Sequence, residues 1–125
     1  MIRTAFFARS AFALAAVAAL ASATPSFAQS GDGLDRRILI ANRSGQTVTY
    51  VRGSPVSADS FGADRIPDRV LGHGGNAVVD FDSGTGDCMY DLRVTLADGR
   101  NIDRMNVNVC RVSRWTINRR SNDLR

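Results

Sequence analysis

Few side chains in this sequence are suited to catalysis. The chain has one histidine, two cysteines and no glutamate, and all 12 of its acidic residues are aspartate. His73 lies in the sequence Gly-His-Gly-Gly, where its ring could reach solvent. No nearby residue is placed to orient it, as a general base or a metal-binding imidazole requires. We therefore interpret His73 as an exposed turn residue and predict no catalytic residue and no enzyme activity.

The aspartates could instead bind a hard cation. If the strands run up and down in chain order, loops 53–68 and 82–87 and the residues after Cys110 emerge at one end of the domain. Carboxylate oxygens are the ligands that Ca²⁺ prefers. A calcium site there would draw on five residues: Asp59, Asp64, Asp68, Asp82 and Asp87. Their spacing matches no named calcium loop, so we predict no cofactor and keep Ca²⁺ as an alternative.

The competing interpretation of these aspartates is structural. Asp59 could cap the N-terminus of one helical turn that starts at Ser57. The other carboxylates could form ion pairs with arginines expected near the same end, namely Arg52, Arg65, Arg69 and Arg111.

The stretch from Gly86 to Arg111 specifies a hairpin. Apolar side chains recur at every second position from Cys88 to Leu96, which is the pattern of a strand with one buried face. Asp98-Gly99 is a dipeptide that favours a two-residue type I′ turn. On the polar face, Asp91 and Arg93 are adjacent and could form a weak ion pair.

A two-residue turn fixes the register of the return strand. Three facing pairs follow from it: Leu92 with Met105, Tyr90 with Val107, and Cys88 with Val109. Ile102 lies on the opposite parity from Met105, so we expect a β-bulge near Asp103–Arg104.

Residues 1–28 have the features of a signal peptide. Arg3 and Arg9 form a positive leader, an uncharged apolar run covers residues 11–23, and Ser26-Phe27-Ala28 supplies small residues for cleavage after Ala28. The apolar run is short for a membrane anchor. We predict a periplasmic or secreted protein with no stable membrane insertion after cleavage.

Export favours a disulfide between Cys88 and Cys110. The hairpin count leaves Cys110 one position beyond the partner of Cys88, so the bond requires the strand end to bend. Closing this loop restricts the unfolded chain by about 3 kcal/mol on the chain-entropy model.

Cleavage leaves 97 residues, enough for one domain. We expect a flexible lead at 29–35, a folded domain at 36–118 and a polar tail at 119–125. Besides the hairpin, strands are expected at 36–41, 47–51, 69–71, 77–81 and 113–118, with the first two paired as a second hairpin. Six or seven short strands without a helical period predict an all-β fold, a small antiparallel β-sandwich or barrel.

Apolar residues outside the hairpin give a predicted core. Phe61 and Ile66 should pack inward from the long loop, and Tyr50 should be a core residue rather than a binding surface. The remaining candidates are Ile38, Leu39, Ile40, Val78, Val79, Phe81, Trp115 and Ile117.

The charge balance argues against a nucleic-acid partner. After cleavage 14 arginines face 12 aspartates, a net charge of +2, and the two residue types are interspersed.

The assembled pattern reads N-x-S-G from Asn42, S-P at Ser54, F-G-x-D from Phe61, C-x-Y-D-L-R-V from Cys88, then D-G and C. It resembles a group of small exported bacterial proteins of unknown function. In that group the aromatic residue before the glycine is commonly tryptophan, and Phe61 keeps the apolar side chain without its N–H donor. The resemblance implies an exported small β domain and transfers no catalytic residue.

These features predict a monomeric, non-enzymatic binding or structural module of the cell envelope, whose partner is an envelope protein or ligand. The alternatives are a calcium-dependent binding module and a small envelope enzyme.

Overall fold

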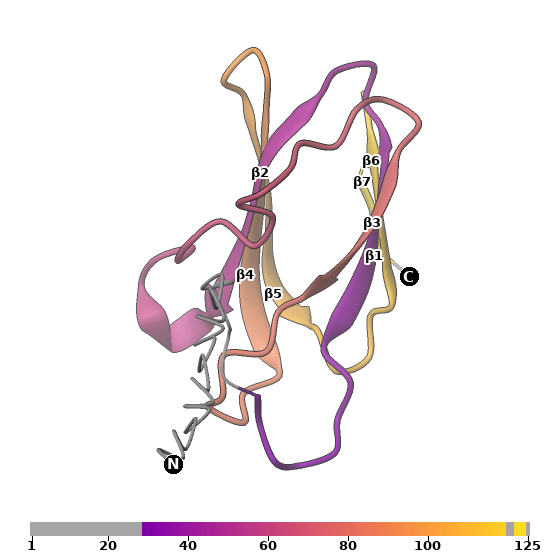
Figure 1. The fold of residues 1–125 in the computed structure, drawn as a ribbon. Coiled ribbons are helices and arrows are strands. Elements are labelled where there is room, and N and C mark those ends of the chain that lie inside the picture. The colour runs from indigo at the N-terminus through magenta and orange to yellow at the C-terminus, as the bar shows by residue number, and fades with distance from the viewer. Residues whose placement is uncertain (1–28, 120–121, 125) are drawn as a thin grey trace, which may run out of the picture.

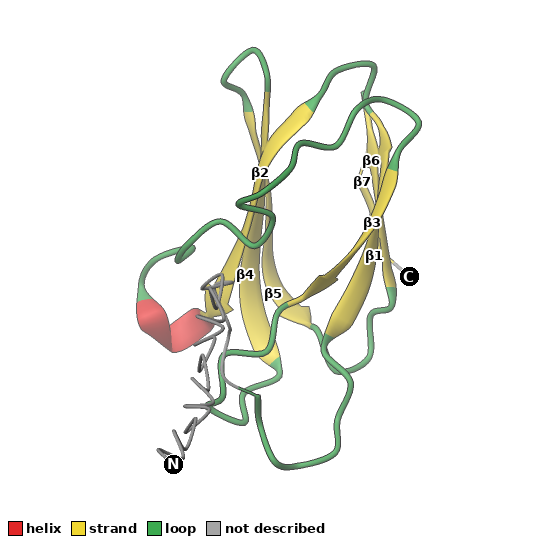
Figure 2. Cartoon of the chain, in the orientation of Figure 1, coloured by secondary structure: helices red, strands yellow, loops and turns green. Residues whose placement is uncertain are grey.

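The computed structural model describes residues 29–119 and 122–124, so the predicted signal peptide lies outside the described residues. The described residues form seven strands and one short 3₁₀ helix, and the strands make two sheets, ordered β3-β1-β6-β7 and β2-β4-β5 (Figures 1 and 2). This arrangement confirms the predicted all-β sandwich. The elements are β1 Arg37–Arg43, β2 Val48–Pro55, η1 Val56–Ala58, β3 Asn76–Asp80, β4 Met89–Leu96, β5 Asn101–Asn108, β6 Arg114–Asn118 and β7 Asn122–Leu124.

The predicted hairpin between the first two strands is wrong, because β1 and β2 belong to different sheets. The cause is the buried Asn42, whose side chain shapes the connection. Its amide donates to the carbonyls of Gln46 at 2.6 Å and Leu71 at 2.9 Å, and its Oδ1 accepts from Ser44 N–H and O–H. These bonds direct the chain across to the opposite layer instead of back along β1.

Strand β1 is central in its sheet. It pairs antiparallel with β3 and parallel with β6, so Leu39 faces Val78 on one side and Arg114 on the other. The expected up-and-down order is therefore wrong for this sheet. Strand β7 pairs antiparallel with β6, which makes part of the expected polar tail a strand.

The hairpin of β4 and β5 forms as predicted, but its turn differs. The backbone bonds Leu96 N–H to Arg100 O and Gly99 N–H to Leu96 O enclose a three-residue loop, 97–99. Only Gly99 has a positive φ there, +88°. A type I′ turn needs two such residues, and the three-residue alternative with one left-handed glycine needs only this one.

The longer loop shifts the register of β5. Tyr90 faces Val107 as predicted, but Leu92 faces Arg104 rather than Met105. The extra residue falls at Met105–Asn106 opposite Asp91, two positions beyond the predicted bulge, and Asn106 takes a φ of +54°. Ile102 therefore faces Val94, on the core side.

The Cys88–Cys110 disulfide is present, with the Cα atoms 5.4 Å apart. Strand β5 ends at Asn108, and the chain then turns, as the bonds from Arg111 N–H and Val112 N–H to Asn108 O show. This turn supplies the bend that the disulfide requires.

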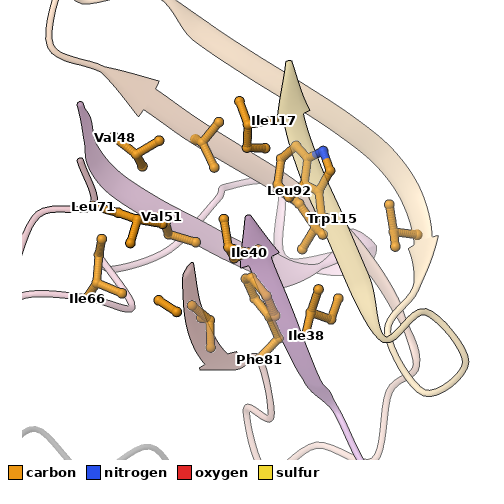
Figure 3. Packing of buried hydrophobic residues seen from close by; sticks show 14 of the residues in the cluster. Ile38, Ile40, Val48, Val51, Ile66, Leu71, Phe81, Leu92, Trp115 and Ile117 are labelled. Carbon is orange, nitrogen blue, oxygen red and sulfur yellow. The ribbon is translucent and has the colours of Figure 1, made fainter. Parts of the chain in front are cut away.

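The core lies between the two sheets (Figure 3). Two predicted core residues are exposed, Val78 at 58% and Tyr50 at 44%, and Phe61 is half-buried outside the core rather than packed into it as predicted. Val78 alternates with the inward-facing Ala77 and Val79, so it points outward. A register irregularity between Val48 and Tyr50 places Tyr50 on the outer face.

The long connection from η1 to β3 closes one side of the sandwich (Figure 1). It runs beside the free edge of β2, with bridges between Arg52 and Asp64 and between Val48 and Leu71. The strand predicted at 69–71 is reduced to that last bridge. Ile66 and Leu71 enter the core from this segment.

Gly53 and Gly62 permit two close approaches on β2. A Cβ on Gly53 would lie 2.6 Å from Phe81 Cδ1, so this position lets the Phe81 ring pack against the strand. A Cβ on Gly62 would lie 2.7 Å from Ser54 Oγ, and its φ is +73°. Gly62 therefore holds the Phe61 loop directly on the outer side of β2.

Candidate functional site

The five aspartates predicted to form a calcium site do not converge. Asp82 is buried and lies beside Ser30. Asp64 and Asp68 line a hollow beside β2, and Asp59 lines a different pocket. Asp87 is exposed and accepts from Thr85 Oγ1 at 2.6 Å. Within residues 29–119 and 122–124, no three His, Cys, Asp or Glu side chains are grouped so as to hold a metal ion. The expectation of convergence depended on an up-and-down strand order that the fold does not have.

The structural interpretation of these aspartates needs correction as well. Asp59 lies at the C-terminal end of η1 with a φ of 52°, so it does not cap the N-terminus of that helix. Asp64 accepts from Val51 N–H at 3.0 Å and Ile66 N–H at 3.1 Å, which fastens the connecting segment to β2. Arg65 donates to backbone carbonyls of Gly53 and Asp82.

The main charged cluster centres on Arg36, which sequence reasoning missed. Its side chain is fully buried and forms a bidentate pair with Asp32 at 2.6 and 2.9 Å. Its Nε donates to the carbonyl of Asp87 at 2.8 Å, and its Nη1 lies 3.8 Å from Asp82 Oδ2. The sequence signal for this pair was the spacing Asp32-x-x-x-Arg36 just before a strand. The spacing of two residues along the chain does not by itself show that the arginine is buried.

Ser30 connects this cluster to the start of the described chain. Its N–H and hydroxyl donate to Asp82 at 2.8 and 2.7 Å, and its hydroxyl accepts from Gly86 N–H. These residues lie in the stretch that we expected to be a flexible lead, and the bonds attach it to the domain.

The pKa values in the cluster favour full ionisation. Arg36 holds the pKa of Asp32 far below its usual range through their hydrogen bonds, and Asp32 raises the pKa of Arg36 in return. Burial opposes ionisation of Asp82, but hydrogen bonds from Gly84 and Ser30, together with the charge of Arg36, outweigh it and lower the pKa of that carboxyl.

A polar pocket of about 370 Å³ lies beside the cluster, lined by residues 29–30, 33–37, Asp80 and Asp82. All three guanidinium nitrogens of Arg36 already donate to protein acceptors. Its two remaining N–H groups make longer contacts, from Nη1 to the Leu34 carbonyl at 3.4 Å and from Nη2 to Cys88 Sγ at 3.9 Å, so all five donors face protein acceptors. The cluster therefore serves to hold residues 30–36 and the loop before β4 together.

His73 also has a structural partner. Its Nδ1 accepts from Gly45 N–H at 2.9 Å, which ties the turn before β3 to the turn after β1. His73 is exposed, and it does not line the pocket beside Arg36, the hollow beside β2 or the pocket at Asp59. This placement agrees with its interpretation as a turn residue.

The outer face of the β2-β4-β5 sheet carries aromatic and arginine side chains in contact. Arg52 lies over the Tyr50 ring at 4.8 Å, and Arg93 lies over the Phe61 ring at 4.1 Å. Arg93 forms a bidentate pair with Asp103 at 2.7 and 2.8 Å rather than with its strand neighbour Asp91. The predicted Asp91–Arg93 pair is therefore wrong, because Asp103 faces Arg93 across the ladder.

A pocket of about 270 Å³ opens on this face, and we call it the outer-face pocket. Its walls come from η1, the loop after it, β4 and the β5 bulge: Val56, Asp59, Ser60, Phe61, Asp91 and Met105. Met105 is 57% exposed because the bulge turns it away from the core.

One left-handed residue lines the outer-face pocket, and a second is bonded to a residue of its wall. Among the described residues, Asp59 and Asn106 are the only non-glycine positions with positive φ. Asp59 lines the pocket, and Asn106 donates its N–H to Asp91, which also lines it, at 3.0 Å. Strained backbone and β-bulges concentrate at binding sites. We therefore take this pocket as the candidate functional site.

No helix in the described part of the chain is long and apolar enough to cross a membrane. A disulfide is compatible with a periplasmic or extracellular location. No family model, curated protein or solved structure matches this chain. The resemblance to small exported bacterial proteins therefore stays a prediction.

Proposed function

We propose that this protein is an exported, non-enzymatic module that binds a partner at the cell envelope through the outer-face pocket. The observation that carries the proposal is a pocket on a disulfide-closed sheet that is lined by the left-handed Asp59 and by Asp91, the residue that the left-handed Asn106 binds through its N–H. A backbone cost at two separate elements is retained where it positions side chains for recognition.

The scaffold supports such a role. Strands β4 and β5 hold one wall of the pocket, and Gly62 seats the opposing loop directly against Ser54 of β2. The Arg93–Phe61 contact fixes the aromatic ring from behind. A rigid surface loses little conformational freedom when it binds, which favours affinity.

Site-specific photo-crosslinking in cells tests the proposal. A photoreactive residue replaces Ser60 at the pocket in the full-length chain, and a matched variant carries it at Val78, which is exposed on the other sheet. We expect export, an N-terminus at Gln29, and a discrete adduct from position 60 only. Retention in the cytoplasm, no adduct, or equal adducts from both positions would contradict the proposal.

A further inference from the structure

We propose that the outer-face pocket accepts one cationic side chain, lysine or arginine, of a partner polypeptide. This inference rests on the proposed binding function and specifies its ligand. It combines the charge of the pocket, its apolar lining and its size.

The charge comes from two carboxylates without a counter-ion. Neither Asp59 nor Asp91 forms an ion pair with any residue in the described ranges. Asp91 accepts one hydrogen bond from Asn106 N–H through Oδ1, which leaves Oδ2 for another donor. An incoming ammonium or guanidinium group would supply the missing positive charge.

The arginine that contacts the pocket lining, Arg93, is already paired. Arg93 gives both arms of its guanidinium to Asp103, and its plane covers one side of the Phe61 ring. Arg93 is thus positioned to support the ring and does not neutralise Asp59 or Asp91. None of the six residues that line the pocket is basic, so a positive occupant fits better than an anionic one.

The lining suits a side chain that is apolar along its stem and charged at its tip. Val56, Phe61 and Met105 supply apolar surface in the same pocket as the two carboxylates. Lysine and arginine bury their methylene stems against such surface and keep the charged head at a polar rim. Met105 is flexible enough to adapt to either.

Size and surroundings distinguish a polypeptide from a free metabolite. A volume of about 270 Å³ falls just below the range of roughly 300–1,000 Å³ typical of sites that enclose drug-sized ligands. Met89, 43% exposed, lies two residues before Asp91 on β4 and extends the apolar surface beyond the pocket. A partner polypeptide could insert one side chain into the pocket and rest its flanking residues on the apolar surface beside it, which matches this size and these surroundings.

Methyl NMR of the exported protein with its disulfide intact tests the inference. The probes are a capped Gly-Gly-Lys-Gly-Gly peptide, the same peptide with uncharged norleucine, and n-butylammonium. We expect a saturable shift of the Met105 methyl signal with the lysine peptide, a weaker response with the other two probes, and a loss of affinity in high salt.

Three isosteric variants locate the effect. Asp59→Asn and Asp91→Asn each remove one negative charge. Asparagine at position 59 still tolerates a left-handed φ, and asparagine at position 91 can still accept the Asn106 N–H. We expect each to raise the dissociation constant roughly three- to five-fold. Asp68 lines a different hollow, so Asp68→Asn should leave the dissociation constant unchanged.

Each contrary result is decisive. No Met105 response, or equal losses in all three variants, would overturn the cationic ligand. Equal binding of n-butylammonium and the peptide would overturn the polypeptide partner. A crosslinked adduct from position 60 alongside a negative titration would leave the proposed binding function standing and reject only this ligand.

Discussion

Ser30 and Asp82 are joined by two hydrogen bonds, from the Ser30 N–H to Oδ2 at 2.8 Å and from its hydroxyl to Oδ1 at 2.7 Å. The pair fixes the second residue after the predicted cleavage site to the loop between β3 and β4. The folded domain therefore begins almost at the expected mature N-terminus, and its stability depends on residues that composition alone would assign to a tether.

Acid should weaken this attachment. The pKa of Asp82 is lower in the fold than in the unfolded chain, so its contribution is present above about pH 4 and is lost as the pH falls further. We expect the free energy of unfolding, measured with urea, to decrease as the pH drops below about 4. Asp82→Asn should be less stable at pH 7 and show a shallower fall, and a profile parallel to that of the unaltered protein would contradict this account.

Arg36 and Arg37 offer a matched comparison of one buried and one exposed guanidinium. Arg36→Lys keeps the charge but loses the bidentate pair with Asp32 and the bond to the Asp87 carbonyl. We expect a loss of about 1–3 kcal/mol in the free energy of unfolding. Arg37→Lys alters only an exposed pair with Asp35 and should leave the urea midpoint unchanged. Equal effects at the two positions would show that burial of Arg36 contributes nothing.

Gly53→Ala should destabilise the fold by about 1–3 kcal/mol, because its Cβ would overlap Phe81 and Leu92 in the core. Gly72→Ala is the control, since a Cβ there would meet no atom within 4 Å. Thermal unfolding of both variants measures the difference. A Gly53→Ala protein as stable as the control would mean that the core has room that the structure does not show.

Removing the disulfide should cost about 3 kcal/mol, because it frees a loop with a sequence separation of 22 in the unfolded state. The variant Cys88→Ser/Cys110→Ser and the reduced protein should unfold at similar, lower urea concentrations. A thiol titration of the exported protein that finds two free thiols would contradict the bond itself.

Calcium should not stabilise this protein. The five aspartates are distributed over separate parts of the fold, and the described residues hold no group of three His, Cys, Asp or Glu side chains. We expect the same thermal midpoint in millimolar Ca²⁺ and in chelator. A midpoint that rises with Ca²⁺ concentration would reveal a site and reverse this conclusion.

Local patterns predicted the strands and the hairpin of β4 and β5 well. Alternation from Cys88 to Leu96 identified the buried face, and Ile102 revealed the bulge. The bulge was misplaced because Asp98-Gly99 is compatible with two turn lengths, and one extra loop residue shifts every pair between the loop and the bulge. The alternation of apolar residues along one strand does not distinguish the two turn lengths; the position of the partner strand is also needed.

Long-range relationships were less accessible. Asn42 reads as an ordinary turn residue, yet its buried amide sends β2 into the other sheet. Arg36 reads as a strand-start charge, yet it is fully buried. The outer-face pocket depends on both the bulge at Asn106 and the left-handed Asp59, and neither φ value is visible in residue types that usually adopt negative φ.

The parallel pairing of β1 with β6 imposes an order on folding. Strand β1 is an inner strand of its sheet, and one of its two neighbours is β6, which comes after β2, η1, β3, β4 and β5 in the chain. A chain that emerges N-terminus first cannot complete this sheet until Arg114–Asn118 has emerged, because a strand that lacks its partner leaves its hydrogen-bonding groups unpaired. Until then the nascent domain stays incompletely folded, which is the form in which a chain can be threaded through a narrow translocation channel.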